Sequence, residues 1–128
     1  MGGDAAMIVA GIGCATGCDA AEIVALVRAA ERLAGVAVQR LAAPVFRQHE
    51  AGLLAAAAEL RAVLSFIDQE ALRAVEPLCP THSARARAAV GVASVAEGCA
   101  LAASRGRLIL PRTASARATC ALAEGDDA

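Results

Sequence analysis

The chain has 128 residues, of which 36 are alanine and 31 are leucine, isoleucine, valine or phenylalanine. This apolar content suffices for one modest hydrophobic core and is too high for a disordered segment. All 12 basic residues are arginine, they face 13 acidic residues, and the only aromatic rings of Phe, Trp or Tyr type are two phenylalanines. The balanced charge and the scarcity of stacking rings argue against a general nucleic-acid binder.

Uncharged stretches and cysteine spacing indicate the cellular environment. The longest uncharged stretch, residues 5–18, is shorter than the about 20 apolar residues that cross a membrane. A secretory signal peptide begins with a positively charged region, and the start of this chain has no arginine or lysine. We therefore expect a cytoplasmic protein without membrane contact, and the odd number and wide spacing of the cysteines indicate reduced thiols. The cysteines are Cys14, Cys18, Cys79, Cys99 and Cys120.

The predicted elements alternate between strands and helices. An apolar run over residues 7–12 predicts a strand that is buried on both faces. Asp19 and Glu22 have the spacing of a helix-capping box, and apolar residues at helical intervals continue to Gly35, where the helix should end. A second strand is expected over residues 36–41, which gives a β-α-β unit.

The same patterns continue to the end of the chain. They predict a helix over 53–60, a strand over 63–67, short helices over 69–75 and 84–89, a helix opened by the Ser94/Glu97 capping box, and strands over 107–110 and 118–122. The polar segment between the last two strands is too short for a helical crossover, so these strands should pair antiparallel.

Together the elements predict an α/β fold. We expect a single three-layer α/β/α domain over residues 1–128, with a mixed, mostly parallel sheet of about five strands and frayed tails at 1–6 and 125–128. Ligands of such sheets bind outside the carboxyl ends of the strands, where helices begin. The candidate segments are therefore residues 13–18, residues 43–50, and the loops before Ser94 and after Leu110.

The first of these segments is rich in glycine. Gly11, Gly13, Cys14 and Gly17 leave the first strand and lead toward a helix. Glycine permits close backbone approach, and helix starts offer unpaired amides, so these residues predict a binding site for an anion. A helix start would also favour the thiolate of Cys14. The alternative is a tight turn required only for packing.

A nucleotide-binding fold is a second interpretation of the glycine spacing. Such folds place an acidic residue at the end of the second strand, where this chain has Gln39 and Arg40. Arg40 could instead contact a 2′-phosphate. We keep a small nucleotide-binding module as an alternative.

Polar residues in two further loops complete the candidate site. Arg47 can hold a carboxylate through two parallel hydrogen bonds, and His49 and Glu50 are the candidate acid and base. Ser94 and Arg112 are candidate ligand contacts, although a solvated loop would explain Arg112 equally well. Cys14 and Cys18 do not have the C-x-x-C spacing of a zinc site, and Cys79 with His82 is the other potential pair of metal ligands. These pairs do not give four residues with zinc-site spacing. We therefore expect neither a metal nor a cofactor.

Several of these segments, taken in order, resemble the CobE family of cobalamin biosynthesis proteins, which is related to the C-terminal domain of CbiG. They are residues 8–14, Glu22-Ile23, Phe46-Arg47 with Glu50, Gly52-Leu53-Leu54, residues 91–97 and residues 118–123. The resemblance implies a role in building the corrin ring near the ring-contraction stage. CbiG opens the ring-A lactone of cobalt-precorrin-5A and releases acetaldehyde, whereas CobE-like proteins lack its other domains.

This chain departs from the family pattern close to the first cysteine. Ala15 and Thr16 stand where the family usually has basic residues, and Arg47 replaces the usual lysine. The difference at Ala15 and Thr16 removes positive charge from the predicted site but leaves its backbone donors.

The residues and the resemblance together suggest a ligand. A precorrin-type tetrapyrrole has many acetate and propionate carboxylates, which suit dispersed amides and arginines. We expect such a ligand at the glycine-rich turn, near the lactone-opening stage, with other enzymes of the pathway as partners. A carrier without catalytic activity is the alternative, as is the nucleotide-binding module.

Overall fold

The computed structural model describes residues 6–81 and 94–126. Five strands form one sheet in the order β3-β2-β1-β5-β4. They are β1 (Ala6–Cys14), β2 (Arg40–Pro44), β3 (Val63–Ile67), β4 (Arg107–Ala114) and β5 (Ala118–Asp126). β1, β2 and β3 pair in parallel, whereas β5 pairs antiparallel with both β1 and β4. The prediction of a mixed sheet whose last two strands are antiparallel is confirmed.

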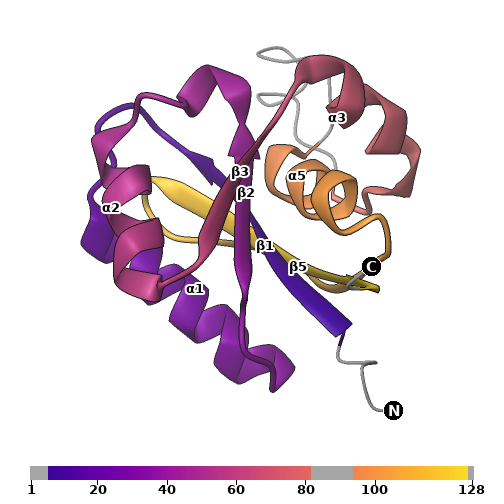
Figure 1. The fold of residues 1–128 in the computed structure, drawn as a ribbon, viewed down its shortest axis with the longest axis horizontal. Helices are drawn as coiled ribbons and strands as arrows, with labels where there is room; N and C mark the ends of the chain where they lie inside the picture. Colours follow the sequence, from indigo (N-terminus) through magenta and orange to yellow (C-terminus); the bar gives the residue numbers. More distant parts are fainter. Residues whose placement is uncertain (1–5, 82–93, 127–128) are drawn as a thin grey trace.

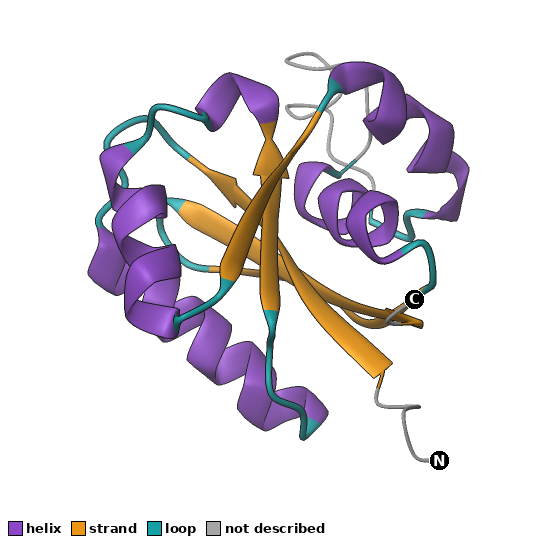
Figure 2. Cartoon of the chain, in the orientation of Figure 1, coloured by secondary structure: helices purple, strands orange, loops and turns teal. Residues whose placement is uncertain are grey.

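Helices cover both faces of this sheet, as the three-layer prediction requires. The helices are α1 (Ala20–Ala34), α2 (Ala51–Leu60), α3 (Gln69–Val75) and α5 (Val95–Ser104). Figure 1 shows α1 and α2 on one side of the sheet and α3 and α5 on the other, and Figure 2 shows the strands between them. The helix expected over residues 84–89 lies outside the described residues.

Alternation along the strands divides the core between the two faces. In β2, Leu41 packs with the α1 and α2 side chains, whereas the next residue, Ala42, packs with Leu72 of α3 and Cys99 of α5. Successive strand residues point to opposite faces. A strand buried on both faces therefore carries an apolar residue at nearly every position, as the run in β1 predicted.

Gly11 sets the contact between β1 and α5. A Cβ atom at this position would lie 1.9 Å from the carbonyl oxygen of Ala96 and 2.6 Å from the amide nitrogen of Ala100. The backbone of α5 thus rests directly on the backbone of β1. Gly11 is therefore required for packing within the fold.

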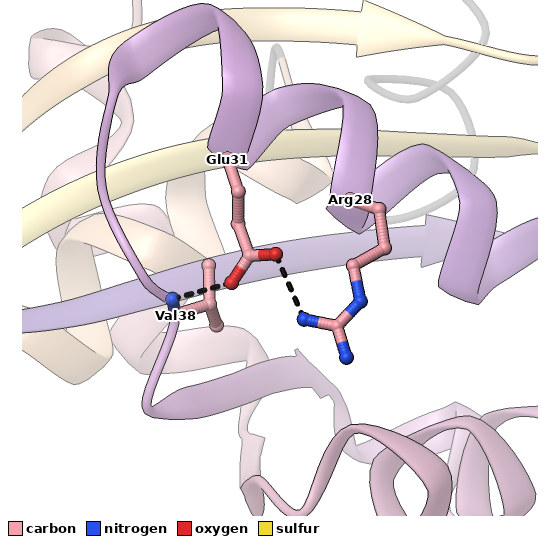
Figure 3. A network of polar contacts seen from close by, with 3 residues as sticks. All are labelled: Arg28, Glu31 and Val38. Atoms are coloured by element: carbon pink, nitrogen blue, oxygen red, sulfur yellow. Dashed lines mark hydrogen bonds and ion pairs between the residues drawn. The ribbon is translucent and has the colours of Figure 1, made fainter.

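The connection from α1 to β2 is fixed by Glu31. Its carboxylate accepts hydrogen bonds from Arg28 Nη1 at 3.0 Å and from the amide of Val38 at 2.8 Å (Figure 3). Val36 and Val38 pack against the core, which explains their strand-like pattern, but the Val38 amide binds this carboxylate. The strand expected over residues 36–41 therefore begins at Arg40.

The last two strands are longer than predicted. β4 continues through Pro111 to Ala114, and β5 continues to Asp126, which pairs with Ala6. β4 is an edge strand with register shifts between Leu108 and Leu110 and again between Leu110 and Thr113. Proline is tolerated at such an edge, so the expected loop over 111–117 is only about half as long. Ala6, Gly125 and Asp126, which were expected in frayed tails, are paired in the ladder of β1 and β5.

Two further expectations concern the whole described chain. None of the helices in residues 6–81 and 94–126 is long and apolar enough to cross a membrane. All five cysteines lie within the described residues and are free thiols there.

Candidate functional site

The candidate segments that the structure describes meet at one edge of the sheet, and the loop before Ser94 lies outside the described residues. β1, β2, β3 and β4 all end at this edge, which we call the carboxyl edge. The turn that follows β1, residues 14–18, contacts the loop over residues 45–50 and the hairpin over residues 115–117 there. The α5 N-terminus is close by, because Val95 lies 3.8 Å from the Cβ position of Gly13.

The turn over residues 14–18 binds a carboxylate that belongs to the protein itself. Gly17 has a φ of 77°, a left-handed conformation that favours glycine. Its amide donates a hydrogen bond of 2.9 Å to Glu50 Oε1. The amide of Ala15 donates to the carbonyl of Arg117, and that of Cys18 to the carbonyl of Ala15. The expectation of unpaired amides in this turn is therefore wrong for these three residues.

The other two glycines of this segment lie within β1. Gly11 pairs with Ala121 and Gly13 with Thr119 in the antiparallel ladder of β1 and β5. Of the three glycines in the predicted anion site, only Gly17 thus lies in the turn. The packing alternative accounts for Gly11.

Arg47 joins the loop over residues 45–50 to this turn. Its Nε donates to the carbonyl of Cys14 at 2.9 Å, and its Nη1 donates to Thr16 Oγ1 at 3.1 Å. The guanidinium also lies 5.0 Å from the ring centre of Phe46, within the range of a cation–π contact. Arg47 is therefore held at the turn, half-buried and in a defined orientation.

Arg117 holds the turn from the opposite side, a role the sequence did not predict. Its Nη2 donates to the carbonyl of Thr16 at 2.6 Å. Its own backbone amide donates at 2.6 Å to Glu22, which also accepts a hydrogen bond from the Ser115 hydroxyl. Thr16 and Arg117 are 101 residues apart in the chain, so no local pattern could reveal this contact.

Glu22 does not form the capping box that its spacing with Asp19 predicted. Asp19 makes no side-chain capping bond to α1. Glu22 instead connects α1 to the hairpin over residues 115–117. The Glu22 carboxylate binds the Ser115 hydroxyl and the Arg117 amide of this hairpin in place of a backbone amide at the start of α1.

These contacts predict a pH dependence of stability. Hydrogen bonds from the Ser115 hydroxyl and then the Arg117 amide lower the pKa of Glu22 below its usual value of 4.5. The ionised Glu22 carboxylate therefore stabilises the folded state. This contribution is complete above the pKa that Glu22 has in the unfolded chain, and it is lost as the pH falls toward the lower pKa of Glu22 in the folded protein. We expect Glu22→Gln to flatten the loss of unfolding free energy below pH 4.5, measured by urea denaturation. The same substitution at the exposed Glu59 serves as control; an unchanged profile for Glu22→Gln would contradict the assignment.

Cys14 is not a reactive thiolate. It ends β1 rather than beginning a helix, since α1 starts at Ala20. Burial raises the pKa of Cys14 to about 11, against the opposing effect of the Arg47 charge. The thiol is therefore protonated at neutral pH, and the expected thiolate is wrong.

A second cluster of polar groups lies at the N-terminus of α5. Ser94 caps the helix by accepting from the Glu97 amide at 3.3 Å, as predicted. The Glu97 carboxylate is fully buried and does not complete the capping box. It accepts hydrogen bonds from the amide and hydroxyl of Thr81, at 2.9 and 2.7 Å, and from the amide of Arg112, at 2.9 Å. Glu97 thus joins α5, β4 and the chain at Thr81.

Arg112 and His49 are placed differently from the residues that hold the turn. Arg112 contributes its backbone amide to Glu97, and its side chain is exposed. His49 is also exposed, in the loop between Arg47 and Glu50. Within the described part of the chain, no hydrogen bond or ion pair joins either side chain to residues 14–18.

The structure also tests two features of the nucleotide-binding and metal-binding alternatives. Arg40 begins β2, at the edge opposite the glycine turn, so the proposed contact with a 2′-phosphate there is wrong. The carboxyl end of β2 leads instead to Val45, Phe46 and Arg47. Among residues 6–81 and 94–126, no group of three or more metal-ligating side chains is close enough to hold a metal ion.

Fold and site define a small α/β protein with a carboxylate-binding turn at the carboxyl edge of a mixed sheet. The family model described as "Cobalamin synthesis G C-terminus" matches residues 8–123, and the chain belongs to this family. It is therefore a protein of the cobalamin biosynthesis pathway, and the resemblance to CobE and CbiG is confirmed.

Two solved structures are similar over nearly their whole length. CobE, a protein from the cobalamin (vitamin B12) biosynthetic pathway, is 31% identical with a TM-score of 0.87, over 93% of this chain and 90% of that one. The cobalamin biosynthesis protein chiG from Agrobacterium tumefaciens is 37% identical with a TM-score of 0.76, over 95% of this chain and all of that one. No curated protein sequence matches this chain.

Proposed function

We propose that the protein binds a precorrin-type tetrapyrrole, near the ring-contraction and lactone-opening stage, at the carboxyl edge of its sheet. The observation that carries this proposal is the placement of Arg47 and Arg117 on either side of the 14–18 turn. Each guanidinium has five N–H donors and uses only part of them on the turn. Arg47 Nη2 and Arg117 Nη1 have no partner among the described residues.

The remaining donors suit the periphery of such a ligand. Acetate and propionate carboxylates extend from the tetrapyrrole ring, and two arginines on a fixed turn can each bind one of them. Val45 and Phe46 lie beside Arg47 with 38% and 52% of their surfaces exposed. These side chains offer apolar contact to the macrocycle while the arginines hold its rim.

Membership of the family supports two kinds of activity. Hydrolysis of a lactone, as in CbiG, requires a base that is free to activate water. Glu50 instead accepts a hydrogen bond from the Gly17 amide, and this observation favours a carrier that passes the intermediate to other enzymes of the pathway. Acetaldehyde release from a lactone-bearing precorrin would establish the hydrolase, and Glu50 and His49 would then be the residues to test.

Loss of Arg47 tests the binding site. A suitable probe is cobyrinic acid, a corrin with free acetate and propionate carboxylates, with its heptamethyl ester as the uncharged control. We expect Arg47→Ala to weaken binding by about 1–3 kcal/mol, or about 5- to 150-fold in Kd by calorimetry, because a charged hydrogen-bond partner is lost.

The matched control is Arg32→Ala, which removes the same charge from an exposed position in the last turn of α1. It should change the Kd by less than about twofold. Equal Kd values for Arg47→Ala and the unsubstituted protein would remove Arg47 from the site. Binding of NADPH without binding of the corrin would favour the nucleotide-binding module.

A further inference from the structure

Glu50 is placed unusually for a residue at the start of a helix. Its backbone has the extended conformation of an N-cap residue of α2, but its side chain makes no capping bond to that helix. The carboxylate reaches instead to the Gly17 amide, 33 residues earlier in the chain. The Glu50 carboxylate thus binds the turn and does not cap the N-terminus of α2.

Arg47 and Glu50 reach the same turn without neutralising each other. Arg47 donates to Cys14 and Thr16, and Glu50 accepts from Gly17. The described contacts include no ion pair between these two side chains, which are three residues apart in one loop. The turn therefore presents a carboxylate bound to its amide next to an arginine that still has free donors.

We infer that Glu50 is an internal ligand of this turn, which the carboxylate of a bound molecule displaces from the Gly17 amide. The inference rests on the proposed function, because the same arginine-flanked turn binds the ligand. One N–H group cannot serve two carboxylates fully, so Glu50 and the ligand compete. Displacement frees the Glu50 side chain while Arg47 still holds the loop to the turn, and this couples occupancy of the site to the N-cap residue of α2.

Weakening the internal ligand should strengthen binding of the external one. Glu50→Gln keeps an uncharged acceptor for Gly17, which holds the turn in place but competes less well than a carboxylate. We expect this variant to bind cobyrinic acid about fivefold more tightly than the unsubstituted protein. Glu59→Gln removes the same charge from the outer face of α2 and should change the Kd by less than about twofold. Equal or weaker binding by Glu50→Gln would overturn the inference.

A second measurement is independent of any corrin. In Glu50→Ala the Gly17 amide loses its acceptor, so added acetate should bind there and move the Gly17 amide resonance in a saturable manner by NMR. Chloride at the same ionic strength should have no such effect, and the unsubstituted protein should respond to neither salt. An unresponsive Gly17 resonance in Glu50→Ala overturns the inference. Acetate binding at Gly17 without corrin binding by any variant would instead refute only the proposed ligand.

Discussion

Replacing Gly11 by alanine is expected to destabilise the protein by about 3 kcal/mol or more. The new Cβ atom would lie 1.9 Å from the Ala96 carbonyl oxygen, and only a shift of α5 away from β1 can relieve that overlap. The loss corresponds to about 10 °C in Tm for a domain of this size. Urea denaturation and calorimetry measure both quantities.

Gly13→Ala is the matched control for this substitution. It lies two residues further along the same face of β1, where the Cβ atom would meet Thr119 Oγ1 at 2.6 Å. A side-chain hydroxyl can rotate away, whereas a helix backbone cannot, so we expect a loss of about 1 kcal/mol or less. Similar losses for the two variants would show that α5 is not held against β1 as described.

Replacing Glu97 by alanine is expected to cost about 3 kcal/mol of unfolding free energy. The substitution removes the acceptor for the Thr81 amide, the Thr81 hydroxyl and the Arg112 amide at once. A buried donor without a partner costs about 1–3 kcal/mol, and water can reach part of this site because Thr81 is only half-buried. The loss should be accompanied by faster hydrogen exchange of the Thr81 and Arg112 amides, which donate to Glu97.

Two further variants separate the hydrogen bonds of Glu97 from its charge. Glu97→Gln keeps the volume and one carbonyl oxygen, and we expect about half the loss of the alanine variant. Glu70→Ala removes an exposed carboxylate from the first turn of α3 and should stay within about 0.5 kcal/mol of the unsubstituted protein. A Glu97→Ala variant as stable as Glu70→Ala would show that the buried network contributes little.

The fold was predictable because its signals are local. The apolar run of β1, the left-handed stop at Gly35 and the cap of Ser94 on α5 each depend on residues close together in the chain. The predicted start of β2 was wrong because a side chain of the preceding helix binds a backbone amide. The side chain is that of Glu31, and the amide is that of Val38.

The candidate site was predictable only as a location. The rule that ligands of α/β sheets bind at the carboxyl ends of strands placed the glycine turn and Arg47 at the same edge. The partners were not predictable, because Glu50 contacts Gly17 across 33 residues and Arg117 contacts Thr16 across 101. Of the predicted charged residues, Arg47 and Glu50 hold the turn itself, whereas the His49 and Arg112 side chains make no hydrogen bond or ion pair with it among the described residues.

The order of the strands has a consequence for synthesis of the protein. β5 follows the other four strands in the chain, yet it lies between β1 and β4. β1, β2 and β3 can pair as soon as they leave the ribosome, whereas β4 joins the sheet only once β5 has been made. Until then, β1 exposes an unpaired edge of nine residues, and such an edge pairs readily with other chains. Aggregation during overproduction should therefore originate at this edge.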